Sequence, residues 1–172
     1  MKGNARMQEL LYSKYSSAMY GICLRYAKDD DEAKEFLQTG FIKIFQKLDT
    51  IKNDKALSSW IRTIMVNNAL TLLNAKNKVV FEEVEENTDL YVEEENVFEP
   101  VLSEEVILKA IAELKNPYKI IFNLACIESY SHKQIGEELN ILESTSRSHL
   151  RRARAMLREV LKKEIALKNK DE

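Results

Sequence analysis

The sequence predicts an all-α protein with two small helical domains joined by an acidic linker. Apolar residues recur at helical spacing through most of its 172 residues, which include only four glycines and two prolines. Such a composition suits long, uninterrupted helices. Charge is also segregated along the chain. Residues 82–105 hold eleven carboxylates and no lysine or arginine, whereas residues 147–170 hold nine basic and two acidic residues. This segregation predicts two surfaces with different partners.

The first domain is expected at residues 1–78. Residues 7–28 carry an apolar stripe that predicts a long, heavily packed helix. The aspartates that follow, from Asp29, break this helix and supply the N-cap of a second one. A third helix follows the polar segment 49–55 and carries the only tryptophan, Trp60. Three amphipathic helices with short connections predict a compact bundle.

The linker is expected at residues 79–102. It has no sustained helical period, and its many carboxylates repel one another and favour an extended chain. Apolar residues such as Phe81 and Phe98 are interspersed among the acids. Two interpretations therefore stay open, a passive tether and a segment that docks in a groove of a partner.

Residues 103–172 predict four helices that end in a helix-turn-helix. Ser131 and Gln134 form the pattern of a capping box at the start of the third helix. Asn140 suits a left-handed C-terminal position, and Gly136 predicts that another helix crosses closely there.

The last helix is expected to have two different faces. Arg147, Arg151, Arg154 and Arg158 follow one another at steps of four, three and four residues, which places them in one stripe. An apolar row lies about a quarter-turn away, at Leu150, Ala153, Leu157 and Leu161. One side can pack against the domain while its neighbour meets a polyanion.

The resemblance to a known family rests first on this segment. The run from Ile135 through Asn140-Ile141 and Thr145 to Arg152-Ala153-Arg154 closely resembles the C-terminal DNA-binding domain of bacterial sigma factors, in particular the extracytoplasmic-function (ECF) class. Three positions depart from the family pattern, with Leu142 in place of an N-cap serine, Ser144 in place of a glycine and Ser146 in place of a core valine. Residues 11–45 and 57–73 are similar to the family's regions 2.1 to 2.2 and 2.3 to 2.4, so the resemblance spans nearly the whole chain.

The resemblance implies an RNA polymerase sigma factor that recognises two promoter elements and assists strand opening. The N-terminal turns of a recognition helix enter the major groove, and later residues meet phosphate. The −35 candidates are Ser144, Arg147, Ser148, Arg151, Arg152 and Arg154. Arg158 is also expected to meet phosphate or solvent. His149 stands near this surface and is expected to be a bystander.

In the N-terminal domain the resemblance implies two further contacts. Positions that match the family's contact with the clamp helices of the polymerase β′ subunit are Glu35 and Gln38, with Glu32 nearby; Thr39 stands where an acid is usual. The −10 candidates are Asn53, Lys55, Ser58, Trp60, Arg62 and Asn67. Trp60 could instead be a core anchor.

Other partners follow from the family alone. It implies core RNA polymerase, promoter DNA and an anti-sigma factor, and a linker that threads the RNA-exit path of the polymerase. We expect no cofactor, no metal and no enzymatic activity, because no nucleophile constellation, ligand cluster or glycine-rich phosphate loop occurs. Cys23 and Cys126 are expected to be buried free thiols.

The N-terminus lacks an apolar core of signal-peptide length, and no run of 18 apolar residues occurs. We therefore expect a cytoplasmic protein without membrane insertion. The alternative function is a stand-alone helix-turn-helix transcriptional regulator with a helical dimerisation domain.

Overall fold

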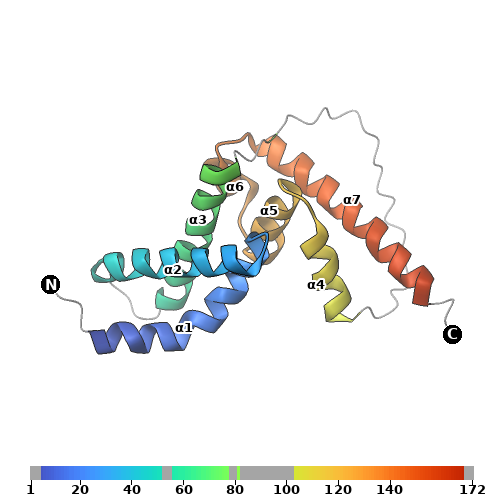
Figure 1. Ribbon diagram of the computed structural model, residues 1–172. Coiled ribbons are helices and arrows are strands. Elements are labelled where there is room, and N and C mark those ends of the chain that lie inside the picture. Colours follow the sequence, from blue (N-terminus) through green and yellow to red (C-terminus); the bar gives the residue numbers. More distant parts are fainter. Residues whose placement is uncertain (1–4, 52–55, 78–80, 82–102, 169–172) are drawn as a thin grey trace. The chain divides into compact units, whose positions relative to one another are not determined.

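The computed structural model describes residues 5–51, 56–77, 81 and 103–168 (Figure 1). Regular structure in these ranges is helical, with no strand among them, and the all-α prediction is confirmed. The chain divides into two compact units, Met1–Lys78 and Val79–Glu172. The predicted linker, 79–102, lies outside the described residues except for Phe81.

The N-terminal unit is a bundle of three helices, each in contact with the other two. They are α1 (Ala5–Tyr26), α2 (Asp30–Lys47) and α3 (Leu57–Asn77), with a short 3₁₀ turn, η1 (Leu48–Thr50), after α2. Their shared core contains the buried side chains of Ile22, Phe36, Phe41, Ile44, Ile61, Met65 and Leu73. Large aliphatic and aromatic side chains at helical spacing therefore build this unit.

Only the second half of α1 is packed as the sequence predicted. Met19, Ile22 and Tyr26 are buried, whereas Met7 and Leu10 are 59% and 57% exposed. The stripe continues over the whole helix, but α2 and α3 cover only part of its length. The prediction of a heavily packed helix is thus wrong for its first turns.

The described part of the C-terminal unit consists of four helices and a π turn. They are α4 (Glu104–Glu113), α5 (Tyr118–Phe122), the turn η3 (Asn123–Ile127), α6 (His132–Leu139) and α7 (Glu143–Lys168). Figure 1 shows α4 beside the second half of α7, where both contribute to one apolar cluster. The buried members of this cluster are Ala110, Ile111, Leu114, Ala153 and Leu157.

Local signals around α6 have the predicted geometry. Ser131 and Gln134 form both halves of a capping box, and Asn140 adopts the left-handed conformation with φ 54° and ψ 49°. At Gly136 the turn makes the closest approach, and the start of α7 also comes close, with the backbone N and Cα of Glu143 at 3.7 and 3.9 Å from the position of a Cβ. A Cβ at this position would lie 2.8 Å from the backbone oxygen of Ile141.

We predict that Gly136→Ala destabilises the C-terminal unit by about 1–3 kcal/mol, because a backbone oxygen cannot move aside cheaply. Gly21→Ala is the control, since a Cβ in the middle of α1 would meet nothing within 4 Å. A gain of up to about 1 kcal/mol is expected there. Urea unfolding followed by circular dichroism reports both units, while fluorescence of Trp60 reports the N-terminal one. Unchanged stability of the Gly136 variant would contradict the close approach.

Candidate nucleic-acid and polymerase interfaces

The two predicted faces of α7 are both present. Leu150, Ala153 and Leu157 are at most 8% exposed and lie inside the unit. Arg147, Arg151, Arg154 and Arg158 are all exposed. Burial of the apolar row therefore leaves the arginine stripe in solvent, where a polyanion can reach it.

The remaining −35 candidates lie around this stripe. Ser144 is exposed, whereas Ser148 and Arg152 are half-buried. The hydroxyl of Ser148 donates to the backbone oxygen of Thr145 at 2.9 Å, so it is already engaged within the helix. Arg147 pairs with Glu143 one turn earlier. A DNA phosphate or base would have to replace that exposed carboxylate.

His149 is not at the surface where the sequence analysis placed it. It is 2% exposed, and its Nδ1 donates to the backbone oxygen of Thr145 at 2.8 Å. Its ring lies 5.4 Å from that of Tyr118 and 5.9 Å from that of Phe81. Burial lowers the pKa of His149, so the neutral ring is favoured in the core.

A second polar pair connects the two helices of the helix-turn-helix. Ser146 is fully buried, and its hydroxyl lies 2.8 Å from Nδ1 of His132 on α6. Sequence reasoning noted the serine in a valine position but did not find its partner. The only signal available was that a buried hydroxyl needs a hydrogen-bonding neighbour.

In the N-terminal unit, Glu32 was predicted to contact the polymerase, but its side chain is buried. It is 5% exposed, and its carboxylate accepts the backbone N–H of Lys28 at 2.8 Å. Asp29 in turn accepts the N–H of Glu32 at 2.8 Å. These bonds cap α2 and leave little of the Glu32 side chain accessible to a partner. Gln38 is exposed and Glu35 is half-buried on the same helix.

Thr39, which stands where the family has an acid, is committed to the interior. Its hydroxyl donates to the backbone oxygen of Glu35 at 2.7 Å and accepts from Nδ2 of Asn68 at 2.8 Å. Nδ2 of Asn68 also lies 2.9 Å from the backbone oxygen of Phe36. Asn68 thus joins α2 to α3, whereas the predicted site residue was its neighbour Asn67.

The −10 candidates do not form one patch among the described residues. Asn53 and Lys55 lie outside those residues. Trp60 and Asn67 are half-buried and seven residues apart, which places them on one face of α3. Ser58 and Arg62 are exposed and lie on a different face. The hydroxyl of Ser58 is 3.1 Å from that of Tyr15 on α1.

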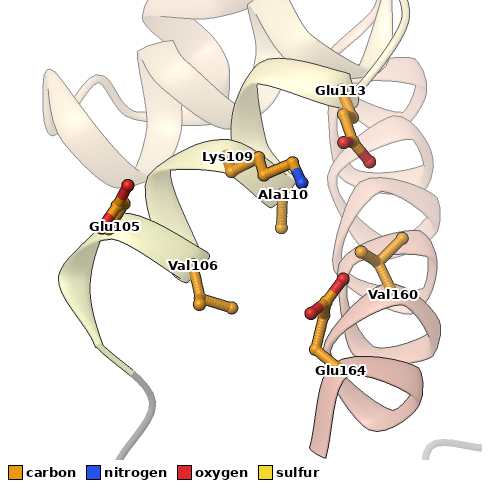
Figure 2. Close-up of a pocket in the computed structure, with 7 residues that line it drawn as sticks. All are labelled: Glu105, Val106, Lys109, Ala110, Glu113, Val160 and Glu164. Atoms are coloured by element: carbon orange, nitrogen blue, oxygen red, sulfur yellow. The ribbon is translucent and has the colours of Figure 1, made fainter. Parts of the chain in front are cut away.

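A groove with a volume of about 210 Å³ lies between α4 and α7 (Figure 2). Its apolar lining comes from Val106, Ala110 and Val160, and its polar lining from Glu105, Lys109, Glu113 and Glu164. Its three carboxylates do not form a metal site, and no group of three potential ligands occurs within the described ranges.

The two cysteines differ in burial. Cys23 is buried as predicted, but Cys126 is exposed, with its sulfur 3.9 Å from Nη2 of Arg154. Burial raises the pKa of Cys23 to about 12, so its thiol stays protonated.

Within the described ranges, no helix has the length and apolar character needed to cross a membrane.

We predict that the C-terminal unit loses stability as the pH falls from about 7.5 to about 5.5. Burial lowers the pKa of both His132 and His149 below the ordinary value of 6.5. The unfolded chain therefore binds protons first, and the stability present above pH 6.5 is lost as the pH falls through the folded values. The chain has only these two histidines, so their NMR titrations can be followed directly. A midpoint at or above 6.5 for His149 would contradict its burial.

Comparison with known proteins places both units in one family. The model for Sigma-70 region 2 matches residues 11–79, and the model for Sigma-70, region 4 matches residues 104–157. The ECF RNA polymerase sigma-E factor of Haemophilus influenzae is 28% identical over 91% of this chain and 88% of that protein. The ECF RNA polymerase sigma factor SigW of Bacillus subtilis is 25% identical over 86% and 85%.

A solved structure has the same fold. The sigma factor RpoE of Bartonella quintana, crystallised with the anti-sigma factor NepR, has a TM-score of 0.54 at 19% identity and covers 90% of this chain and 96% of that one. Regions 2 and 4 therefore occur in the family's order on a chain that aligns with ECF factors over most of its length. The chain belongs to the extracytoplasmic-function family of RNA polymerase sigma factors.

Proposed function

We propose that this chain directs core RNA polymerase to promoters, with the C-terminal unit on the −35 element and the N-terminal unit on the polymerase and the −10 element. The observation that carries the proposal is the exposed arginine stripe of α7, which follows the turn of a helix-turn-helix. This geometry suits insertion of a helix into the major groove. The role is that of an initiation factor, which requires no catalytic site of its own.

At the −35 element, direction along α7 separates two kinds of contact. Ser144, Arg147 and Arg151 are exposed on the first turns, which in a recognition helix enter the groove. Arg154 and Arg158 lie one to two turns further on and are placed for phosphate. Arginine suits both contacts, because its guanidinium binds guanine edges and phosphates through paired donors.

In the N-terminal unit, we assign the β′ clamp-helix contact to Glu35 and Gln38 and leave Glu32 out. Trp60 and Asn67, half-buried on one face of α3, are the candidates for binding a −10 base, which Trp60 could stack. Arg62 offers a phosphate contact from another side of the helix. We thus assign polymerase and −10 contacts to a domain at 1–78 and the −35 contact to a domain at 103–172, with residues 79–102 as the linker.

Two further assignments follow from relatives. The RpoE structure holds an anti-sigma factor, and we propose a partner of that kind for this chain. We place the protein in the cytoplasm, where polymerase and promoter DNA are found. The decisive experiment is a pulldown with core polymerase followed by run-off transcription. A free protein that protects an operator tightly and adds nothing to core enzyme would instead be a stand-alone regulator.

Substitution of two arginines should separate base contact from phosphate contact. Arg147→Ala should reduce the preference for the −35 sequence by about 1–3 kcal/mol, because a base contact is lost. Arg158→Ala should weaken binding to all sequences alike and reduce the salt slope by about one. Titrating holoenzyme into promoter duplexes at several salt concentrations measures both quantities. An unchanged salt slope for the Arg158 variant would refute its phosphate role.

Substitutions on α2 test the proposed contact with the clamp helices of the polymerase β′ subunit. Glu35→Lys should weaken binding to core polymerase about tenfold or more, because a charge at the interface is reversed. Gln46→Lys is the control, since Gln46 is exposed on the same face about 16 Å further along. Surface-immobilised core polymerase gives the affinities, and circular dichroism verifies the fold. Wild-type affinity for the Glu35 variant would remove this residue from the interface.

A further inference from the structure

The residue before α7 offers only its backbone oxygen to the first turn of the helix, where it accepts the N–H of Ser146 at 3.1 Å. Leu142 is 62% exposed, and its hydrocarbon side chain cannot accept the free N–H groups at the helix start. At the corresponding start of α6, Ser131 does accept such an N–H. The orientation of the turns that carry the proposed base contacts must therefore be held from elsewhere in the unit.

Two hydrogen bonds of α6 can provide this support, one to the turn and one to α7. At the turn, the N–H of Ile141 donates to the backbone oxygen of Gly136 at 3.0 Å. Beyond the turn, Ser146 lies 2.8 Å from Nδ1 of His132, which is the first residue of α6. The second contact joins side chains fourteen residues apart and acts directly on the first turns of α7.

Ser146 lies in the buried interior of the unit, where most side chains are apolar. It is fully buried, as are Ile135 and Ala153, and Leu150 is only 6% exposed. A hydroxyl in such surroundings has to find a partner, and its bond is directional. Apolar packing alone would leave α7 freer to rotate or slide, whereas this bond selects one arrangement.

His132 also lies next to the proposed DNA-contacting side chains. Burial lowers the pKa of His132, and the neighbouring positive charges of Arg147 and Arg154 lower it further, whereas Glu143 raises it. Arg147 follows Ser146 directly in the sequence. Whatever fixes Ser146 therefore fixes the backbone from which Arg147 projects.

We propose that His132 is a positioning residue for promoter recognition, and that its hydrogen bond to Ser146 sets the direction in which the first turns of α7 present Arg147. This inference rests on the proposed function, since it names the residue that orients the proposed −35 contact. His132 acts through Ser146, without touching a base. Its effect should therefore appear in sequence discrimination more than in polymerase binding.

The test uses holoenzyme assembled from the full chain and core polymerase. A −35 sequence is first selected from a randomised duplex library with the wild-type protein. Discrimination is then the ratio of Kd values for a duplex with altered −35 bases and for the selected duplex. His132→Ala should lower this ratio about tenfold, the size of one lost base contact. His132→Asn can place a polar atom near the Nδ1 position and should stay within about twofold of wild type.

A double variant separates positioning from stability. His132→Ala leaves the Ser146 hydroxyl buried without its partner, and adding Ser146→Val removes this hydroxyl and should restore the thermal stability. A positioning role predicts that discrimination stays low in this stable double variant. Lys133→Ala, at an exposed neighbouring position on α6, is the control and should match wild type.

The possible results separate failure of this inference from failure of the proposed function. Wild-type discrimination in His132→Ala or in the double variant would overturn the inference alone, because discrimination would then not depend on the hydrogen bond between His132 and Ser146. Loss of discrimination in His132→Asn as large as in His132→Ala would also count against the hydrogen bond. A wild-type holoenzyme without any −35 preference would overturn the proposed function, and the inference with it.

Discussion

Burial of one face of α7 is the interaction on which the C-terminal unit depends. Leu150 and Leu157 each contribute roughly 1.5–3 kcal/mol by leaving water, and α4, α5 and α6 all contact α7. Because helix geometry ties the positions together, sealing this face turns Arg147, Arg151, Arg154 and Arg158 outward. The charged surface therefore results from the packing of the core and needs no separate device to expose it.

In the N-terminal unit, the satisfaction of polar groups decides which side chains remain available to a partner. Glu32 and Thr39 are both polar residues on α2, and the local sequence alone would place either at an interface. Capping of α2 occupies Glu32, and the bond from Asn68 occupies Thr39. Of the predicted polymerase-contact residues on this stretch, Gln38 is exposed and Glu35 is partly accessible. A residue at a position where the family contacts a partner can thus be engaged in hydrogen bonds within its own domain.

Periodicity and local capping were predictable from the sequence, because both depend on residues a few positions apart. The arginine stripe, the Ser131–Gln134 box and the left-handed Asn140 are examples. Burial of single polar residues was not predictable, because it depends on distant neighbours. His149 is enclosed by Tyr118 and Phe81, and Ser146 by α6, which no local pattern discloses. For Cys126 the error is the opposite one, because a cysteine in a helical pattern was predicted to be buried and is exposed.

Stability and orientation have different origins in the helix-turn-helix. Apolar contacts are non-directional and would tolerate α7 in several nearly equivalent positions. Hydrogen bonds and close backbone approaches are directional, and the helix-turn-helix contains three of them: Ser131–Gln134 at the start of α6, Gly136–Ile141 at the turn, and His132–Ser146 between α6 and α7. A helix that reads bases must be placed to within a fraction of a hydrogen-bond length. A buried serine with a histidine partner is therefore a reasonable replacement for a valine here, because it adds direction at a position where packing already supplies the energy.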